Sequence, residues 1–164
     1  ELEYLDRYIF LLKSRYEHRL EVEVDCEESV KQEQLPKIVL QQLVENSIQH
    51  GYNNSKNIMK IHVRGWRDET GWYFEVRDNG QGTTEEVREE LNEKMRKIRK
   101  KIMSRGSSIE LEIGGMGLAN TYARMFLVYN GRAVFRIRNL EEGLSVIIGV
   151  SEKEDEADVS GDDC

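Results

Sequence analysis

Three segments of this sequence combine residue types that can bind and transform a charged ligand. The first covers residues 35–51, L-P-K-I-V-L-Q-Q-L-V-E-N-S-I-Q-H-G. If these residues form a helix, one face carries the polar side chains Gln42, Glu45, Asn46 and Gln49. An amide oxygen such as that of Asn46 suits Mg²⁺, and the neighbouring Glu45 carboxylate can act as a base. An ordinary amphipathic helix with a solvated polar side would show the same pattern.

The second segment, V-R-D-N-G-Q-G at residues 76–82, follows a run of strand-forming residues. Asn-Gly is a common turn signal, and the simplest interpretation is a loop. No matching strand follows, however, because the next residues have a helical pattern. The Asp78 carboxylate can accept a hydrogen bond from an exocyclic amine, which would reject a purine with a carbonyl group there. Gly80 and Gly82 would let a ligand approach the backbone closely.

The third segment, G-G-M-G-L-A-N at residues 114–120, places glycines in front of a predicted helix. Backbone N–H groups at a helix start can hold a phosphate, although a hinge followed by a helix cap would explain the same glycines. Other motifs are missing from the sequence. There is no P-loop, the third glycine of the dinucleotide fingerprint is absent, and no His or Cys residues have zinc spacing.

The elements that must position these segments follow from hydrophobic periodicity. Apolar residues at helical spacing predict helices over 2–18, 36–51, 84–105 and from 118 onward, with Pro36 in the first turn of the second. The helix over 84–105 has one apolar stripe, formed by Val87, Leu91, Met95, Ile98 and Ile102. Strands are predicted over 20–25, 58–66, 71–77, 132–139 and 144–150. Because most strands form antiparallel pairs, the sequence predicts an α+β fold, a two-layer α/β sandwich.

The charge of the chain is concentrated at one end. The 164 residues have a formal net charge of −7. Residues 152–164 contain seven acids and one lysine, whereas the other 151 residues carry 24 acids and 23 bases. We expect residues 1–151 to form one domain and residues 152–164 to be a disordered acidic tail. The near-neutral domain argues against nucleic acid as a ligand. No apolar run is long enough to span a bilayer, and the two cysteines have no paired spacing, which favours a reducing compartment.

The three segments together resemble a known family. L-V-E-N-S-I-Q-H-G, D-N-G-Q-G and G-G-M-G-L-A-N look like the N box and the two glycine boxes of the GHKL nucleotide-binding superfamily. The opening Y-I-F-L-L-K-S-R-Y-E-H-R-L resembles the segment before the N box in LytS/YesM-type sensor histidine kinases. The resemblance covers roughly residues 1–150. It implies a Bergerat-type sandwich, in which helices cover one face of a mixed, mostly antiparallel sheet that binds ATP and Mg²⁺.

The resemblance also implies roles for individual residues. Asn46 would bind Mg²⁺, Glu45 would be the base for the phosphoaccepting imidazole, and Asp78 would bind the adenine amine. Gly80 and Gly82 would let the base lie against the backbone. Residues 1–18 would form a lead-in helix, and residues 83–114 would form a mobile lid over the ATP. The remaining residues implied at the ATP site are His50, Gly115, Gly117, Leu118, Asn120, Arg124 and Ser145.

Three positions depart from the family pattern. Gln49 replaces a lysine that often meets phosphate, so positive charge would have to come from elsewhere. The lid residues Arg96, Lys97, Arg99, Lys100, Lys101 and Arg105 could supply it, although a solvated helix face would explain most of these cations. Leu144 replaces a threonine near the base, and the Ser145 hydroxyl could substitute for it. Gln42 occupies the position where hydrolytic relatives have a water-activating glutamate. An amide cannot accept that proton, so phosphoryl transfer to histidine is favoured over hydrolysis.

The sequence therefore predicts the catalytic ATP-binding domain of a sensor histidine kinase. His18, His50 and His62 are poor phosphoacceptors, so the acceptor is expected on a separate dimerisation domain, with a response regulator as an indirect partner. The parent protein is expected to be a membrane-anchored homodimer with this domain at the cytoplasmic face. Two alternatives stay open: a nucleotide-binding or interaction module with impaired catalysis, and a serine kinase of the anti-sigma type.

Overall fold

The computed structural model describes residues 1–51, 58–105 and 117–152. Its centre is one five-stranded sheet with the order β1-β2-β3-β5-β4. The strands are β1 (Leu20–Cys26), β2 (Met59–Asp68), β3 (Gly71–Asp78), β4 (Ala133–Asn139) and β5 (Leu144–Ser151). Both predicted antiparallel pairs are confirmed, β2 with β3 and β4 with β5. β3 pairs antiparallel with β5, and β1 pairs parallel with β2, which makes the sheet mixed.

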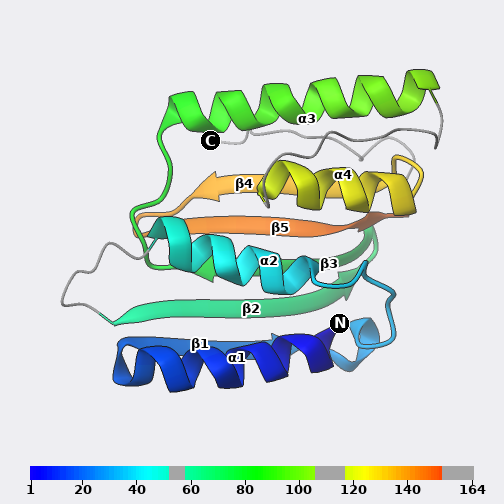
Figure 1. The fold of residues 1–164 in the computed structure, drawn as a ribbon. Coiled ribbons are helices and arrows are strands. Elements are labelled where there is room, and N and C mark those ends of the chain that lie inside the picture. The colour runs from blue at the N-terminus through cyan, green and yellow to red at the C-terminus, as the bar shows by residue number, and fades with distance from the viewer. Residues whose placement is uncertain (52–57, 106–116, 153–164) are drawn as a thin grey trace.

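The helices cover one face of this sheet, as Figure 1 shows. They are α1 (Leu2–Tyr16), α2 (Val39–Asn46), α3 (Glu85–Arg105) and α4 (Leu118–Val128). α2 lies between α1 and α4, and α3 packs against α4. Single short turns of helix cover Glu17–Arg19, Glu28–Val30 and Ser47–Gly51. The prediction of an α+β fold with two layers is confirmed.

The hydrophobic core fills the space between the sheet and these helices. Leu5 from α1, Leu43 from α2 and Met125 from α4 are each at most 1% exposed. The apolar stripe predicted on α3 is confirmed at Met95, which is fully buried, whereas Val87 at its start is 45% exposed. Packing of the helices on the sheet therefore fixes the position of α2 relative to the ends of β3 and β5. Two of the predicted ligand-binding segments lie on α2 and at the end of β3.

The start of α2 differs from the prediction. Pro36 does not lie in the first turn, because the helix begins at Val39. Ile38 has left-handed backbone angles, φ 70° and ψ 9°, and turns the chain into the helix axis. At the other end the helix runs into the turn Ser47–Gly51, so the predicted end at Gly51 is confirmed.

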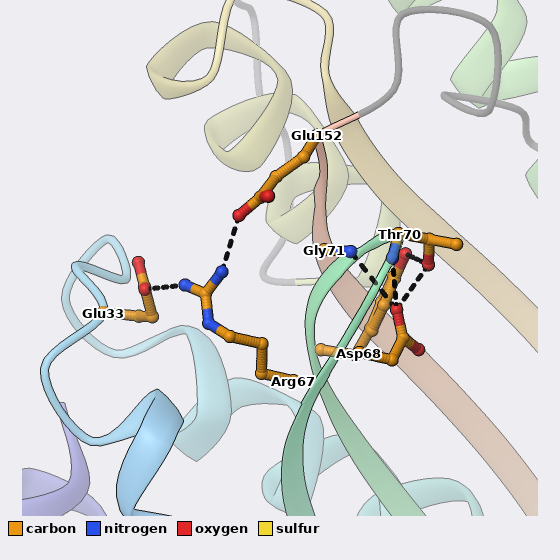
Figure 2. Close-up of polar contacts among 7 residues, drawn as sticks. Glu33, Arg67, Asp68, Thr70, Gly71 and Glu152 are labelled. Atoms are coloured by element: carbon orange, nitrogen blue, oxygen red, sulfur yellow. Dashed lines mark hydrogen bonds and ion pairs between the residues drawn. The ribbon is translucent and has the colours of Figure 1, made fainter.

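Arg67, at the end of β2, joins two parts of the chain that are distant in sequence. Its guanidinium donates to Glu33, before α2, and to Oε1 of Glu152 at 2.5 Å (Figure 2). At the adjoining turn, Asp68 accepts hydrogen bonds from Thr70 and Gly71, and the Thr70 hydroxyl contributes most to lowering the pKa of Asp68. Glu152, the first residue of the predicted acidic tail, is thus held at the sheet. Residues 153–164 lie outside the described residues. None of the described helices combines the length and apolar character needed to cross a bilayer.

Candidate functional site

One cavity brings the three predicted segments together. It has a volume of about 460 Å³ and lies between α2, the ends of β3 and β5, and the first turns of α3. Small-molecule sites typically have volumes of roughly 300–1,000 Å³. Six of the residues predicted to contact nucleotide line it, namely Asn46, His50, Asp78, Gly82, Gly117 and Leu118. Apolar side chains complete the wall: Leu43, Val87, Leu91, Ile137, Leu144 and Val146. A flat apolar ring with a polar edge fits such a wall.

Asp78 is a buried charged residue in the wall of this cavity. Its side chain is 6% exposed, and its Oδ1 accepts hydrogen bonds from the backbone N–H groups of Gly80 at 2.9 Å and Leu144 at 3.3 Å. Burial raises the pKa of Asp78, and hydrogen bonds from Gly80, Ser47 and Leu144 oppose that shift. These hydrogen bonds fix the orientation of the carboxylate, which faces a ligand-sized space. Recognition of an exocyclic amine by hydrogen bonding requires this arrangement.

The residues of α2 separate into two groups. Asn46 lines the cavity, and no other described residue hydrogen-bonds to its side-chain amide. Its oxygen is therefore available to a hard cation such as Mg²⁺, which takes few protein ligands when phosphates supply the others. Glu45 does not line the cavity, and its Oε1 accepts a hydrogen bond from Nε2 of Gln49 at 3.1 Å. The carboxylate lies beside the site rather than in it. Within the described residues, no group of three His, Cys, Asp or Glu side chains forms a metal site.

The first turns of α3 form the outer wall of the cavity. Lys94 lines it together with Glu90, and the two side chains form an ion pair of 2.7 Å. Of the lid cations expected from the sequence, Arg96 and Lys97 instead contact Glu93, and Arg99 lies over the Phe126 ring. Lys94 was not among the lid cations expected from the sequence. One feature of the sequence did indicate Lys94: it follows Leu91 by three residues, which places it beside the apolar stripe of the helix. The lid residues 106–114 lie outside the described residues.

Replacing Lys94 with alanine is expected to weaken ATP binding about fivefold at low salt, because an ammonium facing the cavity attracts the triphosphate. Adenosine, which has no phosphate, should bind equally well to both proteins. Titration calorimetry with each ligand measures this difference. The matched control is Lys97→Ala, because Lys97 is on the same helix and does not line the cavity. Equal losses of ATP affinity in both variants would contradict a role for Lys94.

The glycines of the two boxes have different environments. Gly82 lines the cavity and has φ +69°, a backbone conformation that favours glycine. Gly80 does not line it. Instead, a Cβ built on Gly80 would lie 2.4 Å from Cα of Gly51, so Gly80 is needed for close packing against the end of the turn after α2. Among the described residues, a Cβ on Gly117 would meet no heavy atom within 4 Å. Gly115 lies outside the described residues.

Two other predicted site residues, Arg124 and Asn120, do not line the cavity. Arg124 donates through Nη2 to the Lys37 carbonyl oxygen at 2.5 Å, at the start of α2. Asn120 lies in the first turn of α4, where its N–H bonds to the Gly117 carbonyl oxygen. Gln42, from the hydrolysis argument, accepts a hydrogen bond from Thr121 Oγ1 at 3.2 Å. The contacts of Arg124 and Gln42 connect α4 to α2 and a residue before its start, and the expected place of Arg124 near phosphate stays a prediction.

Ser145 lies on the opposite face of the sheet. It pairs with Arg77, whereas Asp78 is the next residue along β3 and therefore points to the other face. Its hydroxyl donates to Oε1 of the buried Glu75 at 2.5 Å. The expectation that Ser145 replaces the missing threonine is thus corrected. What reaches Asp78 from this strand is the backbone N–H of Leu144.

A comparison with protein families identifies this arrangement. The model of the histidine kinase-, DNA gyrase B- and HSP90-like ATPases matches residues 31–154. The chain belongs to this family. The matched range includes every residue that lines the cavity. Because the family consists of ATPases, ATP is the ligand expected in this cavity.

Curated relatives of this GHKL domain are sensor proteins. The chain is 33% identical over 144 residues to the sensor protein LytS of Enterococcus faecalis, covering 87% of this chain and 22% of that protein. It is 30% identical over 147 residues to LytS of Staphylococcus saprophyticus, covering 89% of this chain and 23% of that protein. The chain thus spans about a fifth of the length of these relatives.

Solved structures with the same fold are histidine kinase domains. The catalytic domain of histidine kinase ThkA superposes with a TM-score of 0.60 at 14% identity, covering 92% of this chain and 91% of that domain. The histidine kinase domain of a blue-light activated kinase from Erythrobacter litoralis gives a TM-score of 0.54 at 14% identity, covering 90% of this chain and 59% of that one. At these identities the likeness supports the fold.

Proposed function

We propose that this GHKL domain is the catalytic ATP-binding domain of a two-component sensor histidine kinase. It binds Mg·ATP and transfers the γ-phosphoryl group to a histidine on a dimerisation domain. The observation that carries this proposal is the single cavity in which Asp78 of β3 and Asn46 of α2 face one ligand-sized space under α3. The similarity to LytS sensor proteins over most of the chain supports the assignment to this kinase class.

The chain's own residues suggest a division of labour. Asp78 accepts a hydrogen bond from the adenine amine, and the apolar wall around it packs against the ring. The Asn46 amide oxygen would hold Mg²⁺, which supplies charge neutralisation at the phosphates. Lys94 adds positive charge from α3. Positioning and electrostatics of this kind account for most of the catalysis in phosphoryl transfer.

Glu45 is proposed as the base for the incoming histidine. It is adjacent to Asn46 but outside the cavity wall, so an acceptor side chain can reach it from another protein surface. Its hydrogen bond from Gln49 holds the carboxylate in place. Gln42 cannot activate water, because its amide has no basic oxygen, and it is held by Thr121. These two features favour transfer to histidine over hydrolysis.

The whole parent protein is inferred from its relatives. Because the LytS relatives are sensor proteins about four times as long as this chain, we infer a membrane-anchored homodimer with this domain at the cytoplasmic face. The phosphoryl group would then pass from the histidine to a response regulator.

The test supplies the dimerisation domain of Enterococcus faecalis LytS to this protein with radiolabelled Mg·ATP. Acid-labile phosphate on a histidine is the expected result. Glu45→Gln should slow transfer about a hundredfold, the usual range for loss of a general base, with little change in ATP affinity. Glu23→Gln, on the exposed edge of the sheet, is the control. Binding without transfer would instead indicate a catalytically impaired module, and acid-stable phosphoserine on a partner would indicate the anti-sigma type.

A further inference from the structure

The side chain of Glu1 caps a helix that is 37 residues away in the sequence. Its carboxylate accepts hydrogen bonds from the backbone N–H groups of Ile38 at 2.7 Å and Leu40 at 2.9 Å. α2 has no side-chain cap from its own N-cap residue, because that residue is Ile38. Figure 1 shows the N-terminus of the chain beside the start of α2. A carboxylate at this position satisfies N–H groups that the helix leaves unpaired and complements its positive end.

Ile38 needs such an external contact. It has φ 70° and ψ 9°, which is unfavourable for a β-branched residue. Burial does not force this conformation, because the side chain is 44% exposed. Polar contacts hold the backbone instead: Glu1 accepts from Ile38, and Arg124 donates to the carbonyl oxygen of Lys37. Backbone strain of this kind persists only where the surroundings over-determine it.

The strained entry is directly connected to the nucleotide cavity. α2 is only eight residues long, and its last residue is Asn46. The helix is fixed at its far end too, because Gly51 packs against Gly80 beside Asp78. A helix of two turns behaves as a rigid rod, so a shift at Ile38 moves Asn46 and the turn Ser47–Gly51 by a similar amount. Contacts at the two ends together set where Asn46 lies relative to Asp78.

We infer that Glu1 is a positioning residue for the nucleotide site: its carboxylate holds Ile38 in the left-handed conformation and thereby fixes α2, with Asn46, against the cavity. The inferred effect of Glu1 on ATP binding rests on the proposed function, whereas its inferred effect on the position of α2 does not. It makes α1 part of the site's support, because any displacement of the start of α1 removes the cap from α2.

The experiment compares Glu1→Ala, Ile38→Gly and the double variant with the unchanged protein. The control is Glu3→Ala, an exposed glutamate in the same first turn of α1. The affinity for Mg·AMP-PNP is measured by calorimetry. We expect Glu1→Ala to weaken binding about fivefold to tenfold, the range for loss of a helix cap, and Glu3→Ala to have no effect. Ile38→Gly removes the need for the cap, since glycine adopts positive φ freely. The double variant should therefore bind within about threefold of the unchanged protein.

Rescue separates positioning from plain stabilisation. If Glu1 only adds stability, Ile38→Gly changes affinity by the same factor in both backgrounds, and this additive result overturns the inference. Hydrogen exchange without nucleotide gives a second test. Glu1→Ala should speed exchange at Ser47–Gly51 as well as at Leu40, and the double variant should restore protection. Faster exchange confined to Ile38 and Leu40 would also overturn it. If the unchanged protein binds no Mg·AMP-PNP, the proposed function fails, while hydrogen exchange still decides the role of Glu1.

Discussion

The Asp78→Asn variant is expected to lose ATP binding by at least about a hundredfold while staying folded. The asparagine oxygen can still accept the hydrogen bonds from Gly80 and Leu144 that now reach Oδ1 of Asp78. Its NH₂ group, however, would face the adenine amine as a second donor, which leaves two buried donors opposed. The loss of affinity thus comes from a reversed hydrogen bond rather than from a collapsed site.

The same variant should be more stable than the unchanged protein at neutral pH without ligand. Burial raises the pKa of Asp78 in the folded state above its ordinary value of 3.8. The folded protein therefore binds this proton more tightly than the unfolded chain, and its stability falls as pH rises from 3.8 through the raised value. An asparagine does not titrate, so the gain from Asp78→Asn should appear across that window and persist above it. Site residues that lower the stability of the free protein are common where function needs a buried charge.

Urea unfolding of both proteins between pH 3 and pH 8, with calorimetry against Mg·ATP, measures the two effects separately. Asp25→Asn, on the exposed edge strand β1, is the matched control and should change neither. Binding of Mg·ATP by Asp78→Asn within tenfold of the unchanged protein would show that the carboxylate does not read the amine. A variant that is less stable at every pH would show that the buried charge is compensated in the folded state.

The fold was predictable wherever the structure of an element depends only on its own residues. The two hairpins and the α3 stripe follow from periodicity alone, and the structure confirms them. The start of α2 was not predictable in this way. Pro36 is typical of the first turn of a helix, so the local pattern predicted a start there. The observed cap instead comes from Glu1, which is distant in sequence and accepts hydrogen bonds from the N–H groups of Ile38 and Leu40. A contact between residues 37 positions apart leaves no local signal.

The site was predictable as a set of boxes but not at the level of single side chains. Asn46, Asp78 and Gly82, which come from two of the boxes, line one cavity, while their contacts with nucleotide stay predictions. Ser145 fails because a shift of one residue along a strand reverses the face, and the strand register was unknown from sequence. Lys94 was missed because seven other cations in the same helix have similar surroundings in the sequence. Only the packing of α3 against α4 shows which of them faces inward.

The largest structural effect is expected for Gly80→Ala. The new Cβ would lie 2.4 Å from Cα and 2.7 Å from the carbonyl oxygen of Gly51, and both atoms belong to backbone that cannot move aside cheaply. Overpacking of this kind typically costs about 3 kcal/mol when backbone must shift. Gly51 itself lines the cavity, so separating the two glycines displaces the turn after α2 from Asp78. We therefore expect both lower stability and lost ATP binding.

Gly117→Ala is the matched comparison, because a Cβ there meets no heavy atom within 4 Å in the part of the chain that the structure describes. Gly117 is the N-cap residue of α4, so this change should cost about 1 kcal/mol or less. Thermal unfolding and titration with Mg·ATP of both variants measure the contrast. If Gly117→Ala also abolishes binding while stability holds, its backbone approaches the phosphates closely, and the box acts through the ligand. If Gly80→Ala folds and binds normally, the close contact between Gly80 and Gly51 is not needed. Any role of Gly80 would then have to come from direct contact with the adenine ring. The two variants thus distinguish a glycine needed for packing within the protein, Gly80, from a glycine beside the ligand space, Gly117.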